Sequence, residues 1–142
     1  MENKKSRKLV TVPSAQNSGM QSCADVAGPP PCTFEPDTMC SDALATMASW
    51  DADTAAVCVG KRLFGVLTLS DFRKLHSRPA NGTYVLSIMT PLRHLVHVLP
   101  SASVAAAMST LLESGHEQLP VVDGCDHLVG FISRWPYVAR RG

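Results

Sequence analysis

The sequence has no long apolar run and little net charge. No uninterrupted apolar stretch approaches the roughly 18 residues that a membrane-spanning helix needs. A formal net charge of +1 gives no electrostatic field strong enough to favour nucleic acid or an anionic membrane surface. Residues 1–8 are charged and lead into polar sequence, unlike the apolar core of a signal peptide. We therefore expect a cytoplasmic protein with neither a membrane nor a nucleic acid as its partner.

The spacings of a disulfide framework, a metal site and a catalytic centre are also missing. The five cysteines are odd in number and contain no Cys-x-x-Cys pair, which argues against structural zinc and predicts free thiols. The five histidines add no recognisable spacing, and His94 and His97 would fall on opposite faces of a strand. No nucleophile, base and orienting group can be named together. The sequence predicts no catalytic residue, no metal and no cofactor, so we expect a non-enzyme.

The chain does contain enough apolar material for a compact core. Hydrophobic residues make up 45% of it and charged residues 18%, as in a globular protein of one domain or two small half-domains. Residues 1–31 are instead rich in Ser, Gln, Asn, Gly and Pro, which predicts a disordered tail or linker. A basic cluster at residues 4–8 has three interpretations, which are a nuclear address, a phosphate-binding patch and a solvated tail.

Residues 32–86 predict the order strand, helix, strand, strand, helix, because apolar positions recur first at helical spacing and then in two short runs. The predicted elements are a strand end at 33–36, a helix capped by Asp37, strands at 54–59 and 63–68, a helix at 72–75 and a loop at 76–85. Residues 87–142 predict the same order again. Their predicted elements are a strand at 95–98, a helix capped by Ser101, strands at 119–122 and 128–133, and a closing helix at 134–141.

The two halves align as an internal repeat. Pro100 lies 64 residues after Pro36, and Gly130 lies 65 residues after Gly65 once an insertion near Gly124 is allowed. This pattern predicts an α/β (α+β) fold of two β-α-β-β-α repeats, which occupy residues 32–86 and 87–142.

One stretch, residues 65–71, runs a predicted buried strand into a predicted helix start. Ser70 and Asp71 open the helix, where unpaired backbone N–H groups and the helix dipole suit a phosphate while Asp71 accepts from sugar hydroxyls. The spacing Thr68-x-x-Asp71 equally fits a capping box with a purely structural role. These residues alone leave both interpretations open.

Several motifs resemble the tandem cystathionine-β-synthase (CBS) domain pair, or Bateman module. They are Ile-Met-Thr-Pro at 88–91, Leu-Pro-Val-Val-Asp at 119–123, Leu-Val-Gly-Phe-Ile-Ser at 128–133 and the stretch 65–71, and the resemblance covers about residues 33–141. The stretch 65–71 is similar to the nucleotide-contacting segment in the last repeat of the γ subunit of AMP-activated protein kinase. The resemblance implies two repeats packed sheet to sheet with pseudo-twofold symmetry, and two clefts between them for adenosine-containing ligands.

The resemblance also implies site residues. For one cleft it places the ribose on Asp71, phosphate near Thr68 and Ser70, and the adenine against Val66 and Val96. A turn closes the far side of that cleft with His116, Glu117, Gln118 and Leu119. Glu117 would repel phosphates, which instead favours adenosine, a cationic sulfonium ligand or a metal-bound nucleotide. The candidate ligands are AMP, ADP, ATP and S-adenosylmethionine.

The second cleft is predicted to be weaker. Pro136 stands where the first repeat has Asp71, and proline cannot accept a hydrogen bond from a ribose hydroxyl. Ser133 and Arg134 remain there to meet a phosphate. We expect one strong site per chain.

A different function is a ligand-free assembly module, or the regulatory fragment of a larger enzyme, channel or transporter. The resemblance implies that such modules pair through exposed helices, and Phe72, Trp135 and Tyr137 supply large apolar side chains for such contacts or for the chain's own core. We expect a homodimer.

Overall fold

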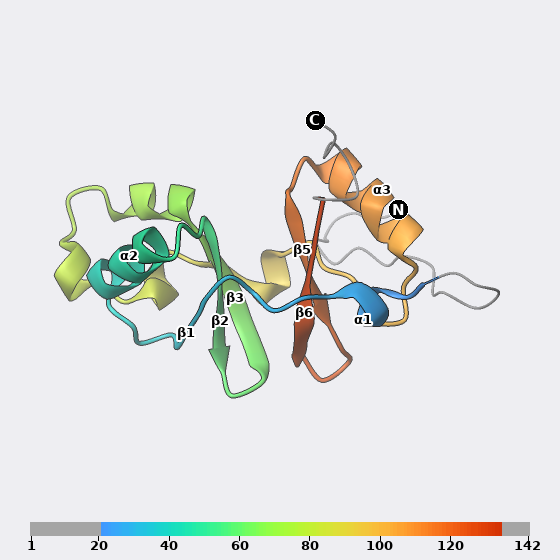
Figure 1. Cartoon of the computed structure of the whole chain (residues 1–142). Coiled ribbons are helices and arrows are strands. Elements are labelled where there is room, and N and C mark those ends of the chain that lie inside the picture. Colours follow the sequence, from blue (N-terminus) through green and yellow to red (C-terminus); the bar gives the residue numbers. More distant parts are fainter. Residues whose placement is uncertain (1–20, 135–142) are drawn as a thin grey trace. The chain divides into compact units, whose positions relative to one another are not determined.

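The computed structural model describes residues 21–134, which form two compact units. Residues 30–95 form one, called here the middle unit. Residues 21–29 together with residues 96–134 form the other, called here the split unit. Each unit has its own strands and helices (Figure 1), so the predicted mixed α/β class is confirmed. The predicted closing helix with Trp135, Pro136 and Tyr137, and the basic cluster at 4–8, lie outside the described residues.

The middle unit is a four-stranded sheet in the order β1-β2-β3-β4, in which β1 is parallel to β2 and the other neighbours are antiparallel. Its longer elements are β1 (Thr33–Phe34), α2 (Cys40–Ser49), β2 (Thr54–Val59), β3 (Arg62–Thr68), the 3₁₀ helix η2 (Leu69–Leu75) and β4 (Thr90–Pro91). Three shorter 3₁₀ turns, η3 (Ala80–Gly82), η4 (Val85–Ser87) and η5 (Leu92–His94), flank β4.

The core of the middle unit lies between α2 and one face of the sheet. Met47 on α2 is fully buried and belongs to the same core cluster as Val57 on β2 and Leu67 on β3. Helical spacing on α2 and alternation on the strands put these side chains on facing surfaces. The helix begins after Met39, which differs from the predicted cap Asp37. The backbone fixes this start, because Met39 bridges Tyr84 in an antiparallel arrangement.

The split unit builds a similar core with fewer strands. Its elements are α1 (Cys23–Val26), α3 (Val104–Ser114), β5 (Gln118–Val122) and β6 (Leu128–Ser133), with β5 and β6 antiparallel. Leu111 on α3 is buried in one cluster with Leu119 on β5 and Ile132 on β6. Cys23 belongs to the same cluster although it precedes the middle unit in the chain.

Matching hydrogen bonds at corresponding positions support the predicted repeat. In the middle unit the Leu69 N–H donates to the Asp53 carbonyl at 3.2 Å, where β3 ends. In the split unit the Arg134 N–H donates to the Glu117 carbonyl at 2.9 Å, where β6 ends. The first pair maps onto the second with the offsets that the sequence predicts. Both repeats therefore close their strand pair in the same way.

Residues 22–28 differ from the expected tail, because they pack against the rest of the split unit. Gly28 and Phe131 exchange two backbone hydrogen bonds of 2.9 and 2.8 Å. Cys23 is fully buried, and Val26 and Ala27 pack against the same core. Figure 1 shows α1 beside β6. These small apolar residues complete a core that would otherwise expose one edge of β6.

Residues 87–95 also differ from the expected repeat boundary, because they belong to the middle unit. β4 pairs with β3, so that Pro91 lies opposite Gly65 and Thr90 opposite Val66. In the split unit the pairing of Gly28 with Phe131 occupies the corresponding place. Each repeat is thus completed by a segment that precedes the other repeat in the chain.

The start of the second repeat differs from the prediction in two details. The expected strand at 95–98 is reduced to a parallel bridge between Val98 and Val121. The cap of α3 is Ser103, whose hydroxyl accepts from the Ala106 N–H at 3.1 Å, and not Ser101. The intervening Ala102 is fully buried, and the helix starts two residues later than predicted.

The five cysteines are free, as predicted. Burial raises the pKa of the Cys23 thiol to about 11 and also raises the pKa of Cys32, Cys40 and Cys58, whereas Cys125 is exposed. The protonated form of the buried thiols is therefore favoured at neutral pH. Among the described residues, no helix is long and apolar enough to cross a membrane.

Candidate functional site

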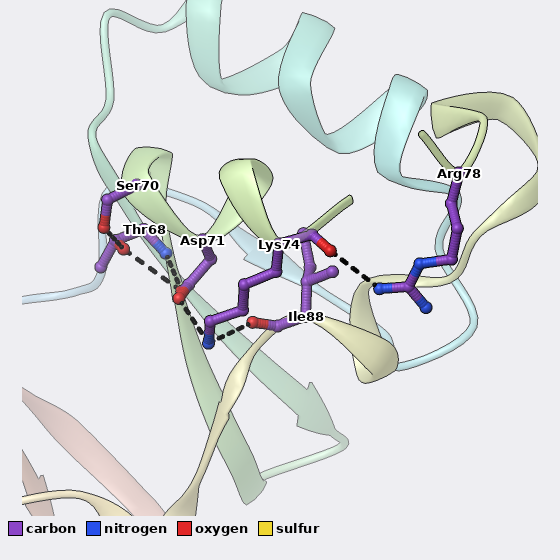
Figure 2. Close-up of polar contacts among 6 residues, drawn as sticks. All are labelled: Thr68, Ser70, Asp71, Lys74, Arg78 and Ile88. Carbon is purple, nitrogen blue, oxygen red and sulfur yellow. Dashed lines mark hydrogen bonds and ion pairs between the residues drawn. The ribbon is translucent and has the colours of Figure 1, made fainter. Parts of the chain in front are cut away.

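The residues at the junction of β3 and η2 are held by the side chain of Asp71. Thr68 caps η2 in an extended conformation, and its N–H donates to Asp71 Oδ2 at 2.9 Å. Its hydroxyl, Oγ1, lies 3.2 Å from the same oxygen (Figure 2). The spacing Thr68-x-x-Asp71 thus forms the capping box that the sequence allowed. The carboxylate therefore has a structural role whether or not it also binds a ligand.

The second oxygen of Asp71 is bound by a lysine that the sequence analysis did not single out. Lys74 Nζ lies 2.9 Å from Asp71 Oδ1 and also donates to the Ile88 carbonyl at 3.0 Å (Figure 2). The Asp71 side chain is only 8% exposed, whereas that of Lys74 is 50% exposed. An acidic residue three positions before a lysine is a known helix pairing, and this spacing was the available signal.

Two hydroxyl groups lie beside Asp71. Thr68 Oγ1 and Ser70 Oγ are 3.0 Å apart, and Ser70 is exposed. Val66 is buried and pairs with Ala56, on the face of the sheet opposite the core that holds Leu67. The structure therefore brings Thr68, Ser70 and Asp71 together, and places Val66 on the same strand just before them.

The split unit gathers its own predicted residues at one end of β5 and β6. Gln118 pairs with Ser133 across the strands, and the hydrogen bond from Arg134 to the Glu117 carbonyl continues this pairing. His116 and Glu117 are exposed, in the turn after α3. Ser133 stands where the first repeat has Thr68.

Two residues of the split unit that were predicted to contact the ligand pack against the core of that unit. The Leu119 side chain is fully buried in the core cluster, so only its backbone is available to a ligand. Val96 is half-buried and packs against the same cluster, in a segment that forms no strand. Alternation along β5 explains the position of Leu119, since Gln118 and Pro120 point to the other face.

One further cluster of chemically active side chains lies at the turn between β5 and β6. The N–H groups of Cys125 and His127 donate to Asp123 Oδ1 at 2.8 and 2.9 Å, and these bonds hold the pKa of Asp123 below its ordinary value. His127 Nδ1 is 3.8 Å from the other carboxylate oxygen. The carboxylate shapes a tight turn here. Within residues 21–134, no group of three or more His, Cys, Asp and Glu side chains is arranged to hold a metal.

Comparison with known proteins identifies the family. The model of the CBS domain matches residues 85–135. A protein with CBS domains from Burkholderia ambifaria is 31% identical, with a TM-score of 0.58, over 71% of this chain and 74% of that one. The CBS-pair protein CBSX2 from Arabidopsis thaliana is 26% identical, with a TM-score of 0.68, over 81% of this chain and 89% of that one.

A second structure of CBSX2 was determined in complex with AMP and is again 26% identical, with a TM-score of 0.67, over 80% of this chain and 90% of that one. A comparison with curated protein sequences finds no significant match. The chain belongs to the CBS-domain family and carries a tandem pair of CBS repeats, as the sequence motifs predicted.

Proposed function

We propose that this protein is a regulatory module that senses an adenosine-containing ligand, with AMP, ADP, ATP and S-adenosylmethionine as candidates. The observation that carries the proposal is the group formed by Thr68, Ser70 and Asp71 at the end of β3, where a buried carboxylate lies beside two hydroxyls. The likeness to CBSX2, which was solved in complex with AMP, supports the same ligand class.

In this proposal each group has a separate task. Asp71 accepts hydrogen bonds from the ribose hydroxyls, and a phosphate lies near Thr68 and Ser70. The Ser70 hydroxyl donates to this phosphate, while the Thr68 hydroxyl keeps its bond to Asp71. Val66 offers an apolar contact to the adenine. We propose that Val96, His116, Glu117 and Gln118, with the backbone of Leu119, supply further contacts to the ligand.

Glu117 separates the candidate ligands. Its carboxylate repels a free phosphate, so a ligand that contacts it is adenosine itself, a sulfonium such as S-adenosylmethionine or a metal-bound nucleotide. We propose a second, weaker site around Ser133 and Arg134, whose hydroxyl and guanidinium suit a phosphate but supply no ribose acceptor.

We further propose that the protein acts by binding alone, without catalysis, as CBS domains are regulatory. Its free cysteines fit a reducing compartment such as the cytoplasm. What the module regulates is then a partner protein or a further part of the same polypeptide, which responds to the ligand-bound state.

Thermal shift measurements with AMP, ADP, ATP and S-adenosylmethionine test the proposal. A ligand that binds only the folded state adds about 2.7 kcal/mol of stability at 100 times its dissociation constant. We expect at least one of the four to raise the melting temperature of the full chain in a saturable way. Inosine monophosphate, which lacks the adenine amino group, serves as the control. If none of the four ligands shifts the transition at millimolar concentration, the proposed function is wrong.

Exposed apolar side chains favour a second candidate function, which is assembly through dimerisation. Trp50 at the end of α2 is 69% exposed, and Tyr84 and Leu86 in the middle unit are 46% and 52% exposed. Aromatic side chains such as Trp and Tyr are enriched at protein–protein interfaces relative to the rest of the surface. We expect sedimentation velocity at micromolar concentration to find a dimer, and Trp50→Ser to shift it towards monomer. A wild type that stays monomeric at the highest concentration would exclude homodimerisation.

A further inference from the structure

We infer that Lys74 makes the Asp71 site selective for the charge of its ligand. Lys74 pairs with one oxygen of Asp71 in the structure. A ribose must displace it, and the released ammonium group then pairs with a phosphate of the ligand. The inference rests on the proposed function, since it assumes that Asp71 is the ribose acceptor.

The Asp71 carboxylate has too few free acceptor positions for a ribose as long as Lys74 is bound to it. An ionised carboxylate offers about four lone-pair positions. The N–H and hydroxyl of Thr68 lie against Oδ2, and Lys74 lies against Oδ1 (Figure 2). A ribose diol has two hydroxyls to donate, so it meets too few vacant positions while Lys74 remains. The bonds from Thr68 maintain the helix cap, which leaves Lys74 as the group that moves.

Lys74 can release Asp71 and still remain at the site. Its side chain is half exposed and flexible, whereas Asp71 is buried and held by the backbone N–H of Thr68. The ammonium group also donates to the carbonyl of Ile88, which lies just before β4. Because an ammonium group has three donors, Lys74 can keep the bond to Ile88 and turn another N–H towards the ligand.

The charge of the ligand decides whether the ion pair that Lys74 loses is replaced. A neutral ligand such as adenosine displaces Lys74 from Asp71 and gives nothing anionic in return. A ligand with a phosphate replaces the lost ion pair with a new one, in a setting less screened than bulk water. S-adenosylmethionine carries a cationic sulfonium, which the released ammonium group would repel. Lys74 therefore favours adenosine phosphates over both other classes. This opposes the preference that Glu117 would give, and we expect Lys74 to prevail because Glu117 is exposed in a turn whereas Lys74 lies against the buried Asp71.

The chain offers a matched control on the adjacent turn. Arg78 is also cationic, and its guanidinium donates to the backbone carbonyl of Lys74 at 3.1 Å instead of pairing with Asp71 (Figure 2). Arg78→Met removes the same unit of charge nearby without vacating an oxygen of Asp71. A conservative variant, Lys74→Arg, keeps the positive charge.

Titration calorimetry with AMP and with adenosine tests the inference on the full-length wild type, Lys74→Met, Lys74→Arg and Arg78→Met. Urea unfolding checks that each variant is folded. We expect the wild type to prefer AMP. Lys74→Met should weaken AMP binding about fivefold or more and leave adenosine binding unchanged or up to threefold tighter. Lys74→Arg should retain the preference, and Arg78→Met should change both affinities less than twofold.

Other outcomes overturn the inference in distinguishable ways. Equal weakening of AMP and adenosine by Lys74→Met would give the lysine a structural role only. No change in either affinity would mean that Lys74 does not meet the ligand. A wild type that binds S-adenosylmethionine but not AMP would retain the proposed function and refute the inference. A wild type that binds none of the candidate ligands would refute both.

Discussion

Deletion of residues 1–29 is expected to unfold the split unit, although a sequence pattern predicts a tail there. The deletion removes Cys23 from the core, together with Val26 and Ala27, which pack against it. It also removes both backbone hydrogen bonds between Gly28 and Phe131. Burying one large apolar side chain contributes about 1.5–3 kcal/mol, so the total loss is a large part of a typical domain's 5–15 kcal/mol.

Urea denaturation followed by circular dichroism measures this effect, and backbone NMR locates it. We expect amide signals of α3, β5 and β6 to collapse into the narrow range of unfolded chains. Deletion of residues 1–20 is the matched control, because it retains every described contact of α1, and it should preserve the dispersion of these signals. Well-dispersed signals from β5 and β6 without residues 1–29 would show that the contacts of residues 22–28 with β6 are not needed for the fold.

A single substitution on β6, Gly130→Ala, tests the contact of this strand with Ala27 and Gly28. A Cβ atom added at Gly130 would lie 2.7 Å from the Gly28 carbonyl oxygen and 3.0 Å from Ala27 Cβ. Gly130→Ala should therefore push the N-terminal segment away and cost about 1–3 kcal/mol of unfolding free energy. Gly124→Ala is the control, since nothing lies within 4 Å of the Cβ it would add.

Replacement of Asp71 by alanine is expected to weaken binding of the adenosine ligand about ten- to a hundredfold. The change removes one or two charge-assisted hydrogen bonds to the ribose, which corresponds to roughly 1.5–3 kcal/mol. The same substitution removes the contacts of Thr68 and Lys74 with a buried carboxylate. We expect it to cost about 1–3 kcal/mol of stability, more than the loss of a cap alone.

Asp71→Asn separates the two roles of the side chain. The asparagine carbonyl oxygen can still accept from the Thr68 N–H, so the cap and most of the stability should survive. The negative charge that binds the ribose hydroxyls and Lys74 is lost. Calorimetry should therefore show weakened binding in a variant that unfolds near the wild-type urea concentration. Wild-type affinity in both variants would leave Asp71 as a helix cap only.

The repeat was predictable because its signals are local. Apolar spacing and the correspondence of Pro36 with Pro100 and of Gly65 with Gly130 lie within each half, and they predicted the strand and helix order. The packing of residues 22–28 was not predictable in this way. Gly28 meets Phe131 from far along the chain, and a Gly- and Pro-rich segment has no periodicity of its own.

Only the local part of the candidate site was predictable from the sequence. The spacing of Thr68 and Asp71 predicted their contact, because a capping box depends on four consecutive residues. Lys74 was missed because its second contact, the Ile88 carbonyl, comes from a different segment. Leu119 was assigned to the ligand, but strand alternation turns its side chain into the core.

Amide chemical-shift mapping by NMR reports both whether an adenosine-containing ligand binds and where it binds. The full chain is titrated separately with AMP, ADP, ATP and S-adenosylmethionine. The proposed function predicts saturable shifts for at least one ligand, largest at the amides of Thr68, Ser70 and Asp71. Absence of shifts with all four ligands at millimolar concentration, or shifts confined to segments remote from Asp71, would contradict it.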